Sequence, residues 1–216
     1  MNCINADKTF EFFSMLNKYK IDYILIKNIV DELPFNLGDG KDIDILVNLE
    51  SKVMFEKMMI DNNFEKCIHP FGIENGWAFY YFMPSHQYWI RKLKNSILYI
   101  NVGFMICCMS LIPKVWIPIK ELNSSVWLNK IFDKKYSWWI IDDRNLLLYL
   151  MIKFIFDKND FSDFYIKQIE IRKHLLHEIK DKMHIVFYNF SPRLSEMVMA
   201  GKYSDIIHNY TTFNEY

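Results

Sequence analysis

The sequence predicts an α+β fold: a mixed β-sheet with flanking helices in residues 1–120, followed by a mostly helical region in residues 121–216 that packs on it. Three observations support this prediction. Short β-rich apolar runs alternate with helical patterns in the first part, whereas the later part keeps a helical period almost throughout. Of the 216 residues, 51% are apolar, which is enough to bury a sizeable core. Gly and Pro, with six of each, are too scarce for the many turns of a sandwich or a propeller.

The first part begins with a predicted amphipathic helix over residues 7–20, where Phe, Leu, Met and Tyr recur at helical spacing. Strands are predicted over residues 22–26 and 42–47, because both are β-rich and turn-forming residues separate them. Asn48 is expected to cap the next helix, which ends at residues 61–63. Further strands are expected at residues 65–69, 77–83, 88–93 and 97–104, with a hairpin turn at Lys94-Asn95.

The second part is expected to be helical after an N-cap at Asp142-Asp143. Residues 146–156 are apolar almost all round, so that helix should be central. Ser162 is expected to cap a helix that runs to Lys180, and Ser191-Pro192 to begin one that ends at Gly201. The pattern between the two parts is weak, and short apolar segments are expected there at residues 114–119 and 138–141.

The charge pattern argues against binding of long nucleic acid. The charges of the 26 basic and 26 acidic residues cancel. Only four of the basic residues are arginines, and these are scattered along the sequence. Proteins that bind nucleic acid usually show a basic stripe and use Arg for phosphate and base contacts. This sequence shows no such stripe, so no long nucleic acid is expected as a partner.

The sequence predicts a cytoplasmic protein without a membrane span. Its first residues are polar and lack the apolar core of a signal peptide. The most apolar run, residues 146–156, contains Lys153 and is shorter than the about 20 residues that a spanning helix needs. The four cysteines (Cys3, Cys67, Cys107 and Cys108) form no C-x-x-C pair and are expected to be buried, reduced thiols.

Asp42 and Asp44 are the candidate site residues with the most informative pattern. On a strand, residues i and i+2 point to the same face, and their Cβ atoms lie about 6.6 Å apart. Two carboxylates at that spacing can converge on one Mg²⁺ ion or on a metal pair. Asp is a poor strand former, so two of them in an Ile/Leu/Val strand suggest a functional site. The alternative is a solvated edge strand, because a bare D-x-D pattern is common.

The residues around this strand resemble a known family. The stretch from Tyr23 to Asn28, the Leu33-Pro34 pair and the run Gly40-Lys-Asp-Ile-Asp-Ile-Leu-Val47 are similar to the start of the nucleotidyltransferase superfamily, the DNA polymerase β-like fold. They especially resemble a divergent branch found among bacterial surface-polysaccharide genes. Residues 146–158 resemble the helical part of such proteins. Only the D-x-D strand is specific enough to carry residue roles over.

The resemblance implies an enzyme that uses Mg²⁺ or Mn²⁺ to transfer a nucleotidyl or phospho-substituent group. Asp42 and Asp44 would be its catalytic metal ligands, and the acceptor would be a hydroxyl of a small molecule or a glycan precursor. The superfamily usually has a Gly-Ser pair after the first strand to hold the phosphates, and Lys27-Asn28 stand in that place. Lys27, Asn28 and Lys41 are therefore the candidate nucleotide-binding residues.

The superfamily also takes a third carboxylate from a later strand, and Asn101 stands in that place as a candidate metal ligand. An amide can ligate a hard cation weakly, but it cannot accept a proton as a general base. Three hypotheses stay open: Asp39 or Glu74 substitutes, the acceptor needs no protein base, or catalysis has been lost. In the last case the chain is a non-catalytic binding module.

Two further enzyme classes remain as alternatives. A glycosyltransferase can hold a nucleotide-sugar diphosphate through a D-x-D metal site, but only about 40 residues precede Asp42, which is short for the nucleotide-binding region. A toxin-like transferase would share the chemistry and change the acceptor. Isolated histidines, His69 and His86 in the strand region and the His174/His177 pair on a helix, are expected to be structural or solvated.

Overall fold

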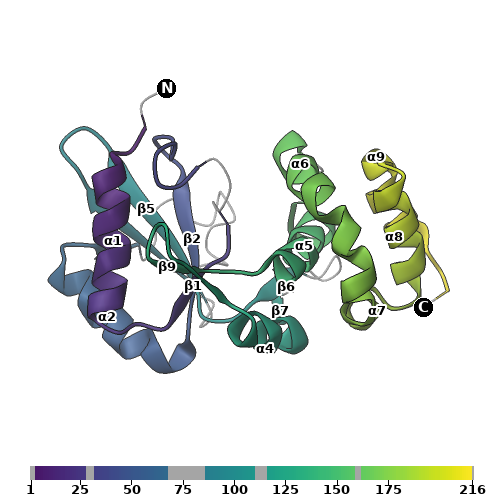
Figure 1. The fold of residues 1–216 in the computed structure, drawn as a ribbon, viewed down its shortest axis with the longest axis horizontal. Coiled ribbons are helices and arrows are strands. Elements are labelled where there is room, and N and C mark those ends of the chain that lie inside the picture. The colour runs from purple at the N-terminus through teal and green to yellow at the C-terminus, as the bar shows by residue number, and fades with distance from the viewer. Residues whose placement is uncertain (1–2, 28–31, 68–85, 110–115, 159–161, 216) are drawn as a thin grey trace. The chain divides into compact units, whose positions relative to one another are not determined.

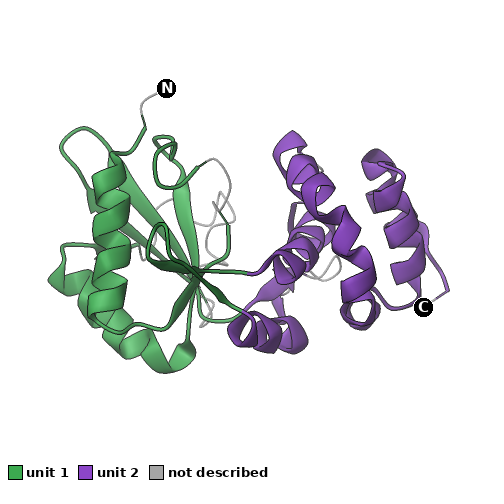
Figure 2. Ribbon diagram, in the orientation of Figure 1, with its two compact units in different colours: residues 1–105, 130–141 green, residues 106–129, 142–216 purple. Residues whose placement is uncertain are grey.

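The computed structural model describes residues 3–27, 32–67, 86–109, 116–158 and 162–215. The chain forms two compact units, shown in Figure 2. Unit 1 contains residues 1–105 and 130–141, and unit 2 contains residues 106–129 and 142–216. The units divide the chain differently from the sequence boundary at residue 120, because residues 130–141 return to the sheet of unit 1. The α+β class, the mixed sheet and the helical C-terminal region are confirmed.

Unit 1 is built on a seven-stranded mixed sheet with the order β3-β4-β5-β2-β1-β9-β8. Two pairings are parallel, β2 with β5 and β1 with β9, and the other four are antiparallel. The expected turn at Lys94-Asn95 is confirmed, since Leu93 N donates to Ser96 O at 2.9 Å between β4 and β5. The strands are β1 (Tyr23–Leu25), β2 (Asp42–Val47), β3 (Glu65–Lys66), β4 (His86–Lys92), β5 (Ile97–Gly103), β8 (Ile131–Asp133) and β9 (Trp138–Ile140). The strand expected at residues 77–83 lies outside the described residues.

Helices cover one face of this sheet. Helix α1 (Ala6–Lys18) and helix α2 (Lys52–Asp61) lie on the same side in Figure 1. Asn48 caps the short 3₁₀ turn Leu49–Ser51 before α2, and its side chain accepts from Glu50 N at 3.1 Å, as its sequence position predicts. The core under the helices takes one side of the sheet, and its largest fully buried side chains are Phe12, Phe13, Tyr23, Phe55 and Trp89.

The alternation of β2 decides which face is which. Ile43, Ile45 and Val47 belong to the core under the helices, whereas Asp42 and Asp44 point to the opposite face because side chains alternate along a strand. We call this opposite face the site face. The chain reaches β2 through a turn in which Lys41 N donates to Gly38 O at 3.0 Å. Gly40 has φ +80° in this turn, a conformation that favours glycine.

Unit 2 is mostly helical and is organised around helix α5 (Asp143–Ile152), which continues in a π-helical turn over Lys153–Lys158. Asp142 caps α5 by accepting from Arg144 N at 3.1 Å and Asn145 N at 3.2 Å, and residues 145–152 are all buried. The predicted central helix is thus confirmed. The other elements are β6 (Cys107–Met109), β7 (Trp116–Pro118), α4 (Lys120–Leu128), α6 (Asp163–Arg172), the 3₁₀ segment Lys173–Ile179, α7 (Lys180–Phe187), the 3₁₀ turn Tyr188–Phe190, α8 (Ser191–Met199) and α9 (Tyr203–Thr212).

Three details of unit 2 differ from the sequence predictions. Helix α4 was not expected, because its segment has a weak helical pattern. The helix expected from Ser162 to Lys180 becomes 3₁₀ after Arg172, and Ser162 makes no side-chain cap bond. Ser191 is the first residue of α8 and does not cap it. Pro192 is therefore the second residue of the helix and not the first. Gly201 follows α8 with φ +68°, as expected for a helix stop.

Buried cations in unit 2 are neutralised inside it. Arg172 contacts Asp143 at 2.5 Å and donates to the Gln168 side chain at 2.8 Å. Lys153 forms an ion pair with Asp157, which also accepts from Met109 N at 2.8 Å. Such groups are tolerated in an interior only when they are paired and hydrogen-bonded.

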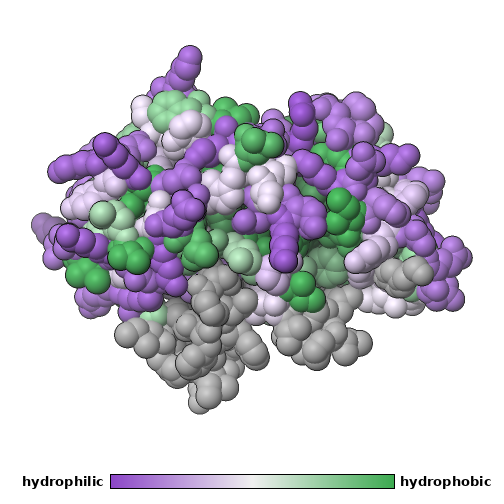
Figure 3. Space-filling model, turned by 90° about the horizontal axis from the view of Figure 1, so that it is seen from below, coloured by the Kyte–Doolittle hydropathy of each residue, from purple (hydrophilic) through white to green (hydrophobic). Residues whose placement is uncertain are grey.

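The surface in Figure 3 is mainly hydrophilic, with apolar residues in separate groups. Of the helices that the structure describes, none is both long and apolar enough to span a membrane.

Phe55 of α2 offers a test of the unit 1 core. It is fully buried and meets the Trp89 ring edge-on at a centroid distance of 6.2 Å. Phe55→Ala should lower the free energy of unfolding by about 3–5 kcal/mol, because it removes a buried ring and leaves a cavity. Denaturant unfolding followed by tryptophan fluorescence measures this. Val53→Ala on the exposed side of the same helix should change the free energy by less than about 0.5 kcal/mol; equal effects would contradict the packing.

Candidate functional site

The site face of unit 1 is assembled by strand register. In the parallel pair β2–β5, Asp42 lies opposite Tyr99 and Asp44 opposite Asn101. In the antiparallel pair β4–β5, Tyr88 lies opposite Asn101. Directly opposed residues share a face of the sheet, so these five polar side chains project from the side that α1 and α2 do not cover.

Asp44 is the buried centre of this face, with a side chain that is 9% exposed. One carboxylate oxygen, Oδ1, accepts a hydrogen bond from Asn101 Nδ2 at 2.9 Å. The other, Oδ2, lies 3.3 Å from Lys27 Nζ in an ion pair. A carboxylate held in an apolar strand needs such partners, because burying it alone would cost several kcal/mol. The structure thus brings together three residues that the sequence analysis had singled out separately.

Lys27 reaches Asp44 because β1 runs antiparallel beside β2. Ile26 N donates to Asp44 O at 3.1 Å, which extends the ladder one step beyond β1. Lys27 follows directly at the strand end, and its side chain is 21% exposed. The sequence analysis placed Lys27 where the nucleotidyltransferase superfamily holds phosphates, and the structure shows it beside a carboxylate.

The other candidates take different positions. Asp42 is half-buried on the site face, two residues from Asp44. Lys41 is exposed and precedes Asp42 in the chain. Asn28, the remaining candidate nucleotide-binding residue, lies outside the described residues, so its prediction stays as it was.

No third carboxylate completes the Asp42/Asp44 pair among the described residues. Nowhere in that part of the chain do three His, Cys, Asp or Glu side chains gather closely enough to hold a metal ion. Asp39, one suggested substitute, is an exposed loop residue. Glu74, the other, is not among the described residues.

His86 was expected to be structural, but it belongs to the site face. It opens β4 opposite Gly103, two residues along β5 from Asn101. A Cβ on Gly103 would lie 3.5 Å from Leu46 Cδ1 and 3.7 Å from His86 Nε2, so the imidazole covers this glycine next to the Asp44 strand. The pairing of His86 with Gly103 could not be read from the sequence, because it depends on the hairpin register.

The tyrosines of β4 and β5 form an aromatic pair on the same face. The Tyr88 and Tyr99 rings are 6.0 Å apart between centroids and inclined at 34°, and both residues are half-buried. One neighbours Asp42 through the register and the other neighbours Asn101.

The donor chemistry of this face fits a hard divalent cation. The carboxylates of Asp42 and Asp44 and the amide oxygen of Asn101 are oxygen ligands, which Mg²⁺ prefers. Mg²⁺ usually takes one or two protein carboxylates and completes its shell with water and substrate phosphates, so two carboxylates are sufficient.

Among the described residues, the histidines and cysteines elsewhere gather into no group that could hold a metal ion, and His69 lies outside the described residues. His174 and His177 are exposed on the 3₁₀ segment, and His177 Nδ1 lies 2.9 Å from the His174 carbonyl oxygen. None of the four cysteines, all of which the structure describes, forms a disulfide. Burial, together with the nearby Asp157 carboxylate, raises the pKa of the Cys108 thiol to about 11, which disfavours the reactive thiolate. Cys107 is buried as expected, but Cys3 is exposed and Cys67 half-buried, so the prediction of four buried thiols was wrong.

The comparisons with known proteins found a likeness in structure but none in sequence. No protein-family model matches the sequence, and no curated protein matches it either. Among solved structures, the chain is similar to a lincosamide antibiotic adenylyltransferase, LnuA, in a crystal structure with lincomycin bound. The sequence identity is 12% and the TM-score 0.46, over 80% of this chain and 98% of that chain. A likeness at this level does not show which reaction this chain performs.

The Lys27–Asp44 ion pair can be tested by a double-mutant cycle. Lys27→Gln, Asp44→Asn and the double variant should reveal a coupling energy of about 1 kcal/mol or more, because both groups are largely buried. Denaturant unfolding measures it. The matched control is Lys92–Glu65, a pair at 3.2 Å whose side chains are 67% and 62% exposed. Its coupling should stay within a few tenths of 1 kcal/mol. Equal couplings would mean that burial adds nothing at Asp44.

Proposed function

We propose that this chain is a Mg²⁺-dependent nucleotidyltransferase that transfers a nucleotidyl or related phospho-substituent group to a hydroxyl of a small molecule or glycan precursor. The observation that carries the proposal is the pair Asp42 and Asp44 on the face of a central strand that α1 and α2 do not cover, with Lys27 and Asn101 held against Asp44. A role in bacterial surface-polysaccharide biosynthesis in the cytoplasm rests on the sequence resemblance alone.

In this proposal, Asp42 and Asp44 hold the metal ion. When bound, the ion neutralises the phosphates and polarises the phosphorus under attack. Asn101 fixes the Asp44 carboxylate through its Nδ2 hydrogen bond and leaves its own amide oxygen available as a weak ligand. The rigid placement of these groups on three adjacent strands favours catalysis, because a preorganised site needs little rearrangement during the reaction.

Lys27 has two roles in this proposal. It neutralises Asp44, since its Nζ lies 3.3 Å from Asp44 Oδ2. It would also contact the phosphates of a bound nucleotide, and Asp44 would then be neutralised by the metal ion that it holds. A lysine suits such an exchange because its charge sits at the end of a flexible four-carbon chain.

His86 is the residue that we assign to proton acceptance from the acceptor hydroxyl. The amide of Asn101 cannot do this. The imidazole shares the site face, and histidine is the side chain that most readily exchanges a proton near neutral pH.

A non-catalytic binding module is the second candidate. Two observations favour it: Asn101 stands where the superfamily has a carboxylate, and Lys27 supplies Asp44 with a cation from within the chain. Such a module would bind nucleotide without converting it. A D-x-D glycosyltransferase would use the same two carboxylates and respond to nucleotide-sugars instead.

The first test is a thermal-shift titration with Mg²⁺ or Mn²⁺ and a panel of nucleoside triphosphates and nucleotide-sugars. The melting temperature of the wild type should rise by about 5 °C or more when metal and the correct nucleotide are present at about 100 times the Kd of the nucleotide. Asp42→Asn/Asp44→Asn, which keeps the side-chain shapes, should lose this shift. The control Asp61→Asn changes an exposed carboxylate at the end of α2, on the other side of the sheet, and should keep the shift.

Each outcome of this titration has a distinct meaning. A shift followed by turnover supports the nucleotidyltransferase. A shift by nucleotide-sugars, with sugar transfer, selects the glycosyltransferase instead. A shift without turnover in any acceptor mixture selects the binding module. If a folded wild type gives no shift with any combination, the metal–nucleotide site at Asp42 and Asp44 is wrong.

The role of His86 is tested separately. His86→Gln should lower kcat by about 10²–10⁴-fold, the usual contribution of a general base, while the nucleotide-dependent thermal shift stays. Steady-state kinetics across pH measure this. The fall in kcat at low pH that reflects protonation of the general base should be absent from the pH profile of the variant. Unchanged kcat and an unchanged pH profile would remove His86 from the mechanism.

A further inference from the structure

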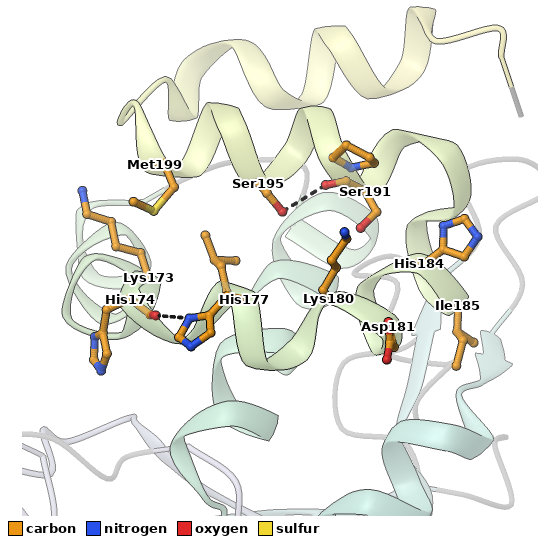
Figure 4. Close-up of a pocket in the computed structure, with 12 residues that line it drawn as sticks. Lys173, His174, His177, Lys180, Asp181, His184, Ile185, Ser191, Ser195 and Met199 are labelled. Atoms are coloured by element: carbon orange, nitrogen blue, oxygen red, sulfur yellow. Dashed lines mark hydrogen bonds between the residues drawn. The ribbon is translucent and has the colours of Figure 1, made fainter.

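A groove in unit 2 lies between α8 and the segment Lys173–Phe187, as Figure 4 shows. Its volume is about 610 Å³. Small-molecule sites typically have volumes of about 300–1,000 Å³, lined mainly by apolar groups with a few convergent polar ones. The groove has both features, and it uses none of the residues of the site face.

The floor and rim of the groove carry apolar side chains that gain nothing from contact with water. Leu176, Ile185, Pro192 and Met199 line it. Ile185 is 46% and Met199 55% exposed, although both are large and apolar. Exposed apolar residues are ordinary when scattered, but a cluster that lines one hollow marks a binding surface.

Polar groups gather where α8 begins. Ser191 lines the groove and is 3% exposed as a whole residue, but its hydroxyl oxygen is not a fully buried unsatisfied atom, so it is accessible from the groove. Figure 4 shows the Lys180 side chain directed toward Ser191 and Ser195 of α8. Lys180 forms no ion pair within the described part of the chain, and the Ser195 hydroxyl donates to the Ser191 carbonyl at 3.1 Å.

The charge at this end of the groove is positive. α8 starts at Ser191, so the positive end of its helix dipole adds to the Lys180 ammonium. Lys173 is already paired with Glu170 at 2.7 Å. Asp181 also lines the groove, but Figure 4 shows its carboxylate directed away from α8. The groove therefore presents one cationic, hydroxyl-rich end and a mainly apolar remainder, which the side chains of His174, His177 and His184 also line.

We propose that this groove binds a small amphipathic anion, with its carboxylate or phosphate monoester at Lys180, Ser191 and Ser195 and its apolar body over Leu176, Ile185 and Met199. Both headgroups have the chemistry that the polar end needs, namely a single negative charge centre with several acceptor oxygens. The Ser191 hydroxyl, which is accessible from the groove, would donate a hydrogen bond to the headgroup.

Isothermal titration calorimetry with four probes tests the proposal: octanoate, octyl phosphate, 1-octanol and inorganic phosphate. The first two carry both features, whereas octanol lacks the charge and inorganic phosphate lacks the apolar body. At least one of the two amphipathic anions should bind at least about tenfold more tightly than octanol or inorganic phosphate, as expected when one charge-assisted hydrogen bond is gained. The tighter anion identifies the headgroup class.

Variants locate the binding. Lys180→Gln should weaken the amphipathic anion about tenfold and leave octanol unchanged. Met199→Gln should weaken every probe that carries the octyl chain. Lys57→Gln, an equal charge change on exposed α2 of unit 1, should alter nothing. Equal binding of octanol and the anions, unchanged binding in Lys180→Gln, or no binding of any probe to folded wild type would each overturn the proposal.

Discussion

The carboxylate of Asp44 is the group on which the arrangement of unit 1 depends. A charge held at 9% exposure in an apolar strand is tolerable only with partners on both oxygens, and these come from two neighbouring strands. The parallel register of β2 with β5 supplies Asn101, and the antiparallel register with β1 supplies Lys27. A slip of β2 by one residue would turn Asp44 into the core and Ile45 out of it, so the charge also fixes the register.

Much of this fold follows from local signals in the sequence. The strand Asp42–Val47, the β4–β5 hairpin and helix α5 with its Asp142 cap could be predicted, because periodicity and capping act over a few residues. The strand order could not. The strands β8 and β9 are only three residues long, too short to indicate their partners, and they join the sheet through the pairing of Ile140 with Leu25. Helix α4 was missed for the same reason: its burial comes from distant partners and not from a strong helical period.

Part of the candidate site could also be predicted from the sequence. The spacing of Asp42 and Asp44 fixes their common face wherever a strand forms, and the family resemblance pointed to Asn101 and Lys27. Neither the spacing nor the resemblance could show that Asn101 and Lys27 both contact the Asp44 carboxylate. These contacts depend on the pairing of strands that are far apart in the sequence. His86 was undervalued since its place opposite Gly103 exists only in the folded hairpin. The metal and nucleotide roles of these residues stay predictions.

The parallel pairing of β9 with β1 has a consequence for how the chain is made. The sheet of unit 1 takes strands from both sides of residues 106–129, which belong to unit 2. During synthesis, the edge of β1 therefore has no strand beside it until Ile140 and Ile141 emerge, and Ile141 N can then donate to Leu25 O. An unpaired strand edge is a template for pairing between chains. A shortened chain that ends at residue 105 would keep that edge permanently, so expression of the first unit as a continuous N-terminal fragment favours aggregation over a soluble domain.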